Sequence, residues 1–254
     1  MLYDNALILH LLTTLYRTTS DDRFKTAVFE TIHWALRDLH QDDGSFASSY
    51  DADSEGVEGR FYIWTYEEVK SLLKPGEERF LDIYGIQPEG NWEGHSILNQ
   101  LHHDDYHIEF ADLKERLRRH RETTRVWPER DDKILCDWNG FMIRALTHAG
   151  ATFNQPQWFD TAKACYETLK SNLWRGDKLI HTMCNGQTGP HGFLEDYASL
   201  ALAALDLFAF GGHGPYLEDA KALYALMEKN FSLENGLFSQ TEGDMENLIT
   251  RPIP

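Results

Sequence analysis

Four carboxylates within eight residues form the densest group of reactive side chains in the sequence: Asp51, Asp53, Glu55 and Glu58. Such close like charges repel, so solvent, a cation or hydrogen bonds must compensate. Asp-x-Asp-x-Glu-Gly matches the first half of an EF-hand-type calcium loop, but the twelfth position is Tyr62 where that loop carries Glu. Two further interpretations stay open: an acid/base pair such as Asp53 with Glu58, and a purely structural loop that pins neighbouring helices. We expect no resident metal and no cofactor.

A second group of acids stands at the predicted starts of three apolar helices. The segments are Tyr3-Asp4-Asn5, Asp137-Trp138-Asn139 and Asp196-Tyr197. An Asp there caps free N–H groups and meets a favourable helix dipole, which is a structural role. If the three starts meet at one end of the fold, the acids also surround one opening. We expect Asp53 and Asp196 to act as acid and base on a glycosidic bond, with Asp4 and Asp137 as alternatives.

Aromatic and polar neighbours of these acids are the predicted substrate-binding groups. Carboxylates accept hydrogen bonds from sugar hydroxyls, and flat aromatic rings stack on the C–H faces of a sugar. The predicted substrate-binding residues are Glu55, Glu58, Trp64, Trp92, His95, Trp138, Asn139 and Tyr197. In a sugar epimerase, histidines would move the proton next to a carbonyl, and the candidates in predicted links are His95, His181 and His191.

Two kinds of helix alternate along the chain and must position these groups. Segments 2–17, 138–152 and 194–210 are apolar nearly all round, whereas segments 22–40, 156–173 and 215–230 each carry one apolar stripe. A helix that is apolar on every side must be covered on every side. The pattern therefore predicts an α/α toroid, in which antiparallel hairpins place the apolar helices in an inner ring and start them all at one end.

The remaining segments are expected to be short. Residues 67–73, 77–84 and 109–121 are predicted as minor helices, and a strand-like aromatic run follows the acidic loop at 60–64. Turn signals at 43–46, 175–180 and 235–238 predict short β-hairpins in the links between helices. The expected fold class is thus mainly α, as a single helical-hairpin domain over residues 1–254.

Composition limits the partners. The formal net charge of -17 argues against binding to nucleic acid or to an anionic membrane surface. No apolar run approaches the roughly 20 residues that span a bilayer, and no secretory signal pattern opens the chain. Three widely spaced cysteines without a CxxC pair indicate reduced thiols. We therefore expect a cytoplasmic protein.

Several motifs together resemble a known family. They are Met1–Ala6, Asp51–Thr65, Gly90–Gly94, Asp131–Leu135 with Trp138-Asn139-Gly140, and Leu194–Ala198. The chain resembles the thioredoxin-domain-containing proteins of the YyaL and spermatogenesis-associated protein 20 group. That family joins a thioredoxin-like domain to a helical domain of six-hairpin glycosidase type, similar to N-acylglucosamine 2-epimerases.

The resemblance implies a fold and a cleft rather than a mechanism. No CxxC or βαβ pattern occurs here, so we expect the thioredoxin-like part to be absent and the chain to match an internal, incomplete part of the toroid. Open ends of such a piece would expose apolar surface that a second copy could cover, which predicts a homo-oligomer. The leading hypothesis is a carbohydrate-active or carbohydrate-binding toroid with a sugar ligand, of glycosidase-like or epimerase-like activity. The alternative is a non-catalytic interaction module with an acidic loop.

Overall fold

A computed structural model describes residues 1–102, 110–211, 214–242 and 252–253. The chain divides into two compact units, one made of Met1–Ser49 and Asp131–Pro254, the other of Tyr50–Arg130. The first is called the hairpin unit below and the second the insert unit. In neither unit do the described residues form a helix long and apolar enough to cross a membrane.

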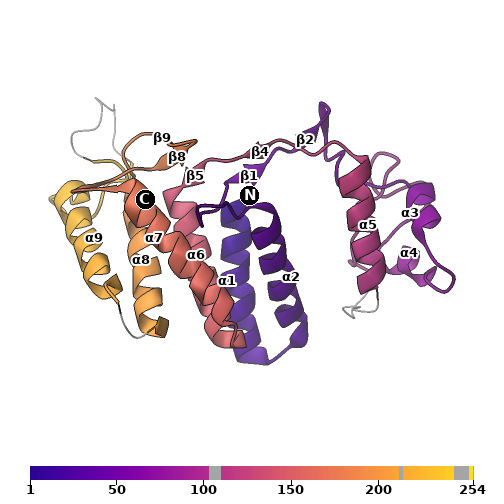
Figure 1. Cartoon of the computed structure of the whole chain (residues 1–254), viewed down its shortest axis with the longest axis horizontal. Coiled ribbons are helices and arrows are strands. Elements are labelled where there is room, and N and C mark those ends of the chain that lie inside the picture. Colours follow the sequence, from indigo (N-terminus) through magenta and orange to yellow (C-terminus); the bar gives the residue numbers. More distant parts are fainter. Residues whose placement is uncertain (103–109, 212–213, 243–251, 254) are drawn as a thin grey trace. The chain divides into compact units, whose positions relative to one another are not determined.

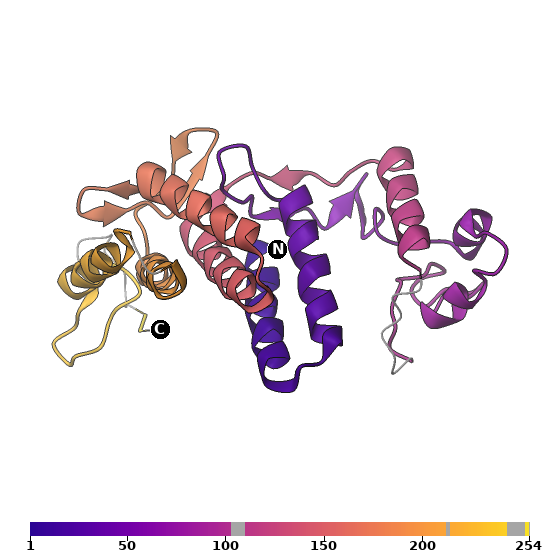
Figure 2. The same ribbon diagram turned by 60° about the horizontal axis from the view of Figure 1, so that its bottom comes forward.

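Among the described residues of the hairpin unit, six long helices form three successive hairpins, which can be followed in Figures 1 and 2. The hairpins are α1 (Leu2–Thr19) with α2 (Asp22–Asp38), α6 (Cys136–Phe153) with α7 (Pro156–Leu173), and α8 (Leu194–Gly211) with α9 (Tyr216–Phe231). Helix α6 packs against both α1 and α8, while α2, α7 and α9 each pack on the partner within their own hairpin. The described helices therefore have the predicted inner and outer layers.

Burial follows the two sequence patterns. The middle inner helix α6 buries residues on most of its surface, among them Met142, Leu146 and Ala149. The outer helix α2 instead buries one stripe that includes Val28, Ile32 and Ala35. Fully burying a Val, Leu, Ile or Met side chain stabilises the fold by about 1.5–3 kcal/mol. The inner helices thus lie where apolar surface is covered from several sides.

Helix ends explain the tight hairpins. Helix α1 ends at Ser20, whose left-handed backbone (φ 57°) lets its N–H bond to the carbonyl of Tyr16. Asp21 then caps α2 by accepting a hydrogen bond from the N–H of Arg23. Asn154 ends α6 in the same left-handed conformation. Small polar residues tolerate this conformation, so the chain reverses within two residues.

Short strands in the links bring the starts of two inner helices together. Strand β5 (Ile134–Leu135) pairs with β8 (Thr182–Cys184), which pairs with β9 (Gln187–Thr188); β6 (Trp174–Arg175) pairs with β7 (Lys178–Leu179). Leu135 is opposite Thr182 in the antiparallel register. Because β5 leads directly into α6 and β8 lies in the link before α8, the pairing fixes the segments in front of both helices.

The described part of the insert unit contains three shorter helices and a core of its own. They are α3 (Tyr66–Leu72), α4 (Arg79–Ile83) and α5 (Ala111–Thr124), with the hairpin of β2 (Asp53–Ser54) and β3 (Val57–Glu58) before them. The core consists of Trp64, Val69, Phe80, Ile83, Ile86, Phe110, Leu113 and Leu117. Strand β1 (Ser49–Tyr50) pairs with β4 (Arg130–Asp131), where the chain enters and leaves this unit.

One local prediction is wrong. Residues 59–62 form turns and Ile63 is irregular, where a strand was predicted, and Trp64 makes an isolated bridge to Ser96. The physical reason is a side chain: the guanidinium of Arg125 takes the carbonyl oxygens of Phe61 and Ile63, which a neighbouring strand would otherwise bind. The predicted fold class, mainly α with short antiparallel strands in the links, is confirmed. That residues 1–254 make a single domain stays a prediction.

Candidate functional site

The starts of α6 and α8 carry the most unusual polar group of the hairpin unit. Asp137 lies in the first turn of α6 and Asp196 in the first turn of α8. Asp196 is completely buried, and its Oδ1 accepts a hydrogen bond of 3.1 Å from the backbone N–H of Asp137. The two helix starts are therefore joined directly by one of the predicted acids.

Asp196 also orients a histidine. The Nδ1 of His181 lies 2.9 Å from Asp196 Oδ2 and 3.1 Å from Oδ1. The N–H of Phe193 donates to Oδ2 as well, at 2.8 Å. The hydrogen bond to Asp196 raises the pKa of His181 above its ordinary value, against the opposing effect of burial. Sequence reasoning named His181 only as one of three link histidines, because its contact with Asp196 depends on the folding of the β7–β9 links.

Asp137 is the carboxyl of this group that can carry a proton. It is 8% exposed, and its Oδ1 is buried without a hydrogen-bond partner among the described residues. Burial first, and then the negative charge of Asp196, raises the pKa of Asp137 to about 6. A carboxyl with such a pKa changes its protonation state at mildly acidic pH, as general acid/base chemistry requires.

The same three side chains have donor types that metals accept. One donor atom from each of Asp137, His181 and Asp196 lies within 4.8 Å of the others, and among the described residues this is the one such cluster. Both oxygens of Asp196, however, already accept N–H hydrogen bonds from His181, Phe193 and the Asp137 backbone. A carboxylate with its lone pairs so engaged is a poor ligand, so the cluster fits a hydrogen-bonded acid group better than a cation site.

Asp4 and Trp138 extend this end of the unit. The rings of Tyr3 and Trp138 lie 4.7 Å apart between centroids, which brings the start of α1 beside the start of α6. The Asp4 side chain is 44% exposed and lies 3.7 Å from the amino group of Met1. Asp4, Asp137 and Asp196 thus all stand at starts of inner helices, with Asp4 the exposed member.

Two other predicted binding residues of this unit are buried and fully engaged. Asn139 accepts from the N–H of Phe46 at 2.8 Å and donates to the Phe46 carbonyl at 3.0 Å. The hydroxyl of Tyr197 accepts from the N–H of Leu179 and donates to Glu242. Both side chains hold links against the inner helices. A substrate-binding role for Trp138, Asn139 and Tyr197 stays a prediction.

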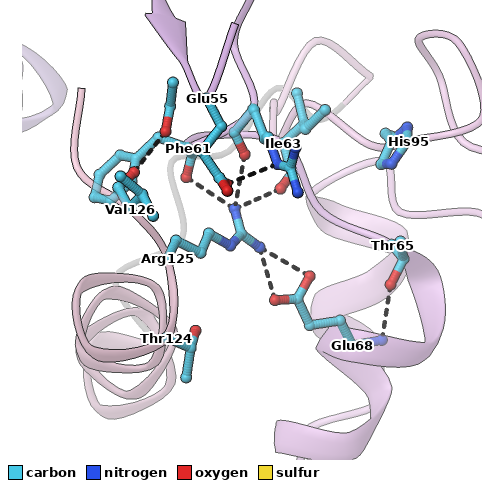
Figure 3. A pocket seen from close by; sticks show the side chains of 11 residues that line it. Glu55, Phe61, Ile63, Thr65, Glu68, His95, Thr124, Arg125 and Val126 are labelled. Carbon is cyan, nitrogen blue, oxygen red and sulfur yellow. Dashed lines mark hydrogen bonds and ion pairs between the residues drawn. The ribbon is translucent and has the colours of Figure 1, made fainter. Parts of the chain in front are cut away.

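The insert unit has a polar hollow of about 430 Å³ (Figure 3). It is lined by Ser54, Glu55, Arg60, Phe61, Ile63, Thr65, Glu68, His95, Thr124, Arg125 and Val126. Glu55 and His95 are the predicted substrate-binding residues among them, and Glu55 forms an ion pair with Arg60 at 3.2 Å. The acidic loop of 51–58 is exposed apart from Ser54, and Asp53 faces Glu58 across the β2–β3 pair.

Arg125, which the sequence did not single out, organises this hollow. Its Nη1 donates to the carbonyls of Phe61 and Ile63, and its Nη2 donates to both oxygens of Glu68 (Figure 3). The guanidinium also lies 4.2 Å above the ring of Trp64, which is 2% exposed. An arginine at the end of a basic helix gives no spacing signal for such contacts.

The last predicted residues of the insert unit lie around its hairpin turns. Trp92 is half-buried and bridges to His95 through the backbone. Asp53 belongs to the insert unit and Asp196 to the hairpin unit. Their joint action as acid and base therefore stays a prediction, as do the roles of Glu58, Trp64 and Trp92.

Sequence comparison relates the chain to a group of curated proteins. A Caenorhabditis elegans protein without a characterised function is 27% identical over 100% of this chain and 41% of its own length. Human spermatogenesis-associated protein 20 is 24% identical over 91% of this chain and 35% of its own length. The chain is thus similar in sequence to spermatogenesis-associated protein 20 over most of its own length. This confirms the resemblance predicted from the motifs, although the chain spans about two fifths or less of these relatives. No protein-family model matches it.

Solved structures show the same fold at low identity. A GH76 α-mannanase from Bacteroides thetaiotaomicron aligns with a TM-score of 0.56 and 11% identity, covering 97% of this chain and 47% of that one. An unsaturated glucuronyl hydrolase from Streptococcus agalactiae aligns with a TM-score of 0.56 and 9% identity, covering 98% and 54%. The chain therefore has the α/α toroid fold of carbohydrate-related proteins, as predicted. Fold alone assigns no reaction.

Proposed function

We propose that the starts of the inner helices form a carbohydrate site in which Asp137 transfers a proton. The observation that carries this proposal is the buried, unpaired Oδ1 of Asp137 beside the Asp196–His181 pair. A protonated carboxyl in such a place can donate to the leaving oxygen of a glycosidic bond. The toroid fold, shared with a mannanase and a glucuronyl hydrolase, supports a sugar as the substrate class.

The roles of the acids differ from those expected at first. Asp196 is fully buried and bonded on both oxygens, so it orients His181 and holds the start of α6, and its charge keeps a proton on Asp137. Hydrolysis needs a second carboxylate that reaches the sugar or a water molecule. Asp4 is proposed for that role, because it is exposed at the neighbouring start of α1. Participation of Asp53 belongs to the same proposal.

A carbohydrate-metabolic role in the cytoplasm is part of this proposal. The described cysteines Cys136, Cys165 and Cys184 are free thiols, which suits a reducing compartment. An epimerase reaction is the alternative chemistry at the same place. It would use the Nε2 of His181, since Nδ1 is held by Asp196.

The test is a panel of chromogenic glycosides and free sugars, assayed between pH 5 and 7 for turnover and by calorimetry for binding. Turnover should fall roughly 100-fold or more in Asp137→Asn, while sugar binding persists, because the amide keeps the shape but carries no acidic proton. Asp160→Asn, at an exposed acid of the outer helix α7, serves as the matched control. Wild-type protein that binds and turns over nothing in the panel would overturn the proposal.

A non-catalytic interaction module is the second candidate. The exposed acidic hairpin with Asp53, Glu55 and Glu58 favours it, since these exposed carboxylates can meet a basic partner from solvent. This alternative predicts that the wild-type protein neither binds nor turns over any sugar of the panel at any pH in that range.

A further inference from the structure

A second polar group lies within the hairpin unit, further along the inner helices than the acids at their starts. It consists of His10 on α1, Arg144 and His148 on α6, and Asp206 on α8. Arg144 Nε donates to Asp206 Oδ2 at 2.8 Å, and His148 Nε2 lies 3.1 Å from the same oxygen. The side chains of Arg144, His148 and Asp206 are each 26% exposed or less. Such a group on three helices needs an explanation beyond surface charge.

The ion pair fixes the direction of the guanidinium. Because Asp206 holds Nε, the two Nη nitrogens of Arg144 are left with no hydrogen bond to any residue that the structure describes. Arg144 and His10 line a hollow of about 380 Å³ between α1 and α6. The rest of its lining is Ala6, Leu7, Leu11, Thr14 and Phe141. The hollow thus combines a free guanidinium edge with apolar walls.

Positive charge outweighs negative charge around His10. Its ring meets that of His148 edge to face, with centroids 4.6 Å apart. Burial lowers the pKa of His10, and the charges of His148, Arg144 and Arg17 lower it further, with Asp206 alone among the main contributors acting the other way. An imidazole held neutral by burial and by nearby cations indicates a place where the cations would stabilise a bound anion.

We propose that this hollow binds a small organic carboxylate with an apolar ring or chain. The planar Nη edge of Arg144 would receive both carboxylate oxygens, the geometry in which arginine binds carboxylates most strongly. Phe141, Leu7 and Leu11 would cover the apolar body of the ligand. The site is separate from the group of Asp137, His181 and Asp196 and does not depend on the proposed function.

The test uses benzoate as the probe and benzamide as its uncharged isostere, with binding followed by NMR on the full chain. Benzoate should bind and shift the ring signals of His10 and His148, and benzamide should bind roughly tenfold more weakly or worse. Arg144→Met should weaken benzoate binding by a similar factor. The control Arg175→Met removes an exposed charge of the same unit and should leave binding unchanged.

A second pair of variants tests the proposal even if Arg144→Met fails to fold. Leu11 is 56% exposed, so Leu11→Trp should fold and fill the hollow without touching any charge. It should abolish benzoate binding, whereas Leu202→Trp, on the exposed face of α8, should not. Equal binding of benzoate and benzamide, or benzoate binding that survives both Arg144→Met and Leu11→Trp, would overturn the proposal. Asp137→Asn should leave benzoate binding intact, which separates this site from the carbohydrate site.

Discussion

At the residue scale, burial distinguishes the Asp137 carboxyl from those of Asp4 and Asp196. Asp4, Asp137 and Asp196 occupy equivalent positions at helix starts, so the sequence could name them but could not rank them. Exposure and hydrogen bonding rank them: Asp4 is exposed, Asp196 is saturated with donors, and Asp137 is buried with an unpaired oxygen. These differences come from packing between distant segments, which spacing along the chain does not encode.

The raised pKa of Asp137 predicts a pH-dependent stability. The pKa of Asp137 rises from 3.8 to about 6 on folding. The carboxyl's favourable contribution to the free energy of unfolding is therefore present below pH 4 and is lost as pH rises through 6. Asn has no carboxyl to ionise, so the variant Asp137→Asn does not lose this stability as pH rises. The stability of Asp137→Asn relative to wild type should thus increase by up to about 3 kcal/mol between pH 4 and pH 7. Urea unfolding across this range measures the difference, and a constant difference would contradict the burial argument.

The Asp196–His181 hydrogen bond predicts a titration that NMR can follow. The pKa of His181 is raised chiefly by this bond, so stability from the pair is present below pH 6.5 and is lost as pH rises through the raised value. In Asp196→Asn the pKa of His181 should fall below its wild-type value, because burial is then opposed only by the weaker effects of the Asp137 and Glu195 charges. Histidine ring signals recorded against pH give both values. An unchanged His181 titration in the variant would show that the bond does not form in solution.

At the scale of elements, the helices were predictable and their attachments were not. Periodicity gave α1, α2, α6, α7, α8 and α9 with ends within a few residues, because amphipathic and all-apolar helices have distinct patterns. The turn at 59–63 was missed because a distant arginine sets it. The sequence also gave no sign that Asn139 holds the link containing Phe46, 93 residues away.

Asn139 provides the test at this scale. Its amide satisfies both the N–H and the carbonyl of Phe46 in a fully buried place. Asn139→Ala leaves those backbone groups unpaired and should lower the free energy of unfolding by about 3 kcal/mol. Asn5→Ala, whose bond to the Met1 carbonyl lies near the surface, should change it by less than about 0.5 kcal/mol. Equal effects in thermal or urea unfolding would mean that the link does not depend on this amide.

At the scale of the whole molecule, two compact units share one chain, and each has its own core. The alternation of helix types predicted the hairpin unit, while the irregular stretch of residues 66–122 gave no comparable pattern for the insert unit. Its organisation depends on Arg125, which joins α3 to the turn of 59–63. Local opening should therefore be separable between the units.

Hydrogen exchange can show this separation. Arg125→Met leaves the carbonyls of Phe61 and Ile63 without their donor and leaves Glu68 with His120 as its remaining ion-pair partner, so it should lower protection in the insert unit by about 3 kcal/mol. Protection of α6 and α7 in the hairpin unit should stay as in wild type. Arg60→Met breaks only the exposed pair with Glu55 and should have little effect anywhere. Equal loss of protection in both units would show that they unfold as one.

The central claim is that Asp137 holds its proton at mildly acidic pH because it is buried beside Asp196. Titration of the Asp137 side-chain carboxyl by carbon-13 NMR measures this directly, in wild type and in Asp196→Asn. We expect a wild-type pKa of about 6 for Asp137 and a lower pKa in the variant, where the neighbouring negative charge is gone. A wild-type pKa close to the ordinary 3.8 would contradict it, since Asp137 would then have no proton to give at the pH of the proposed reaction.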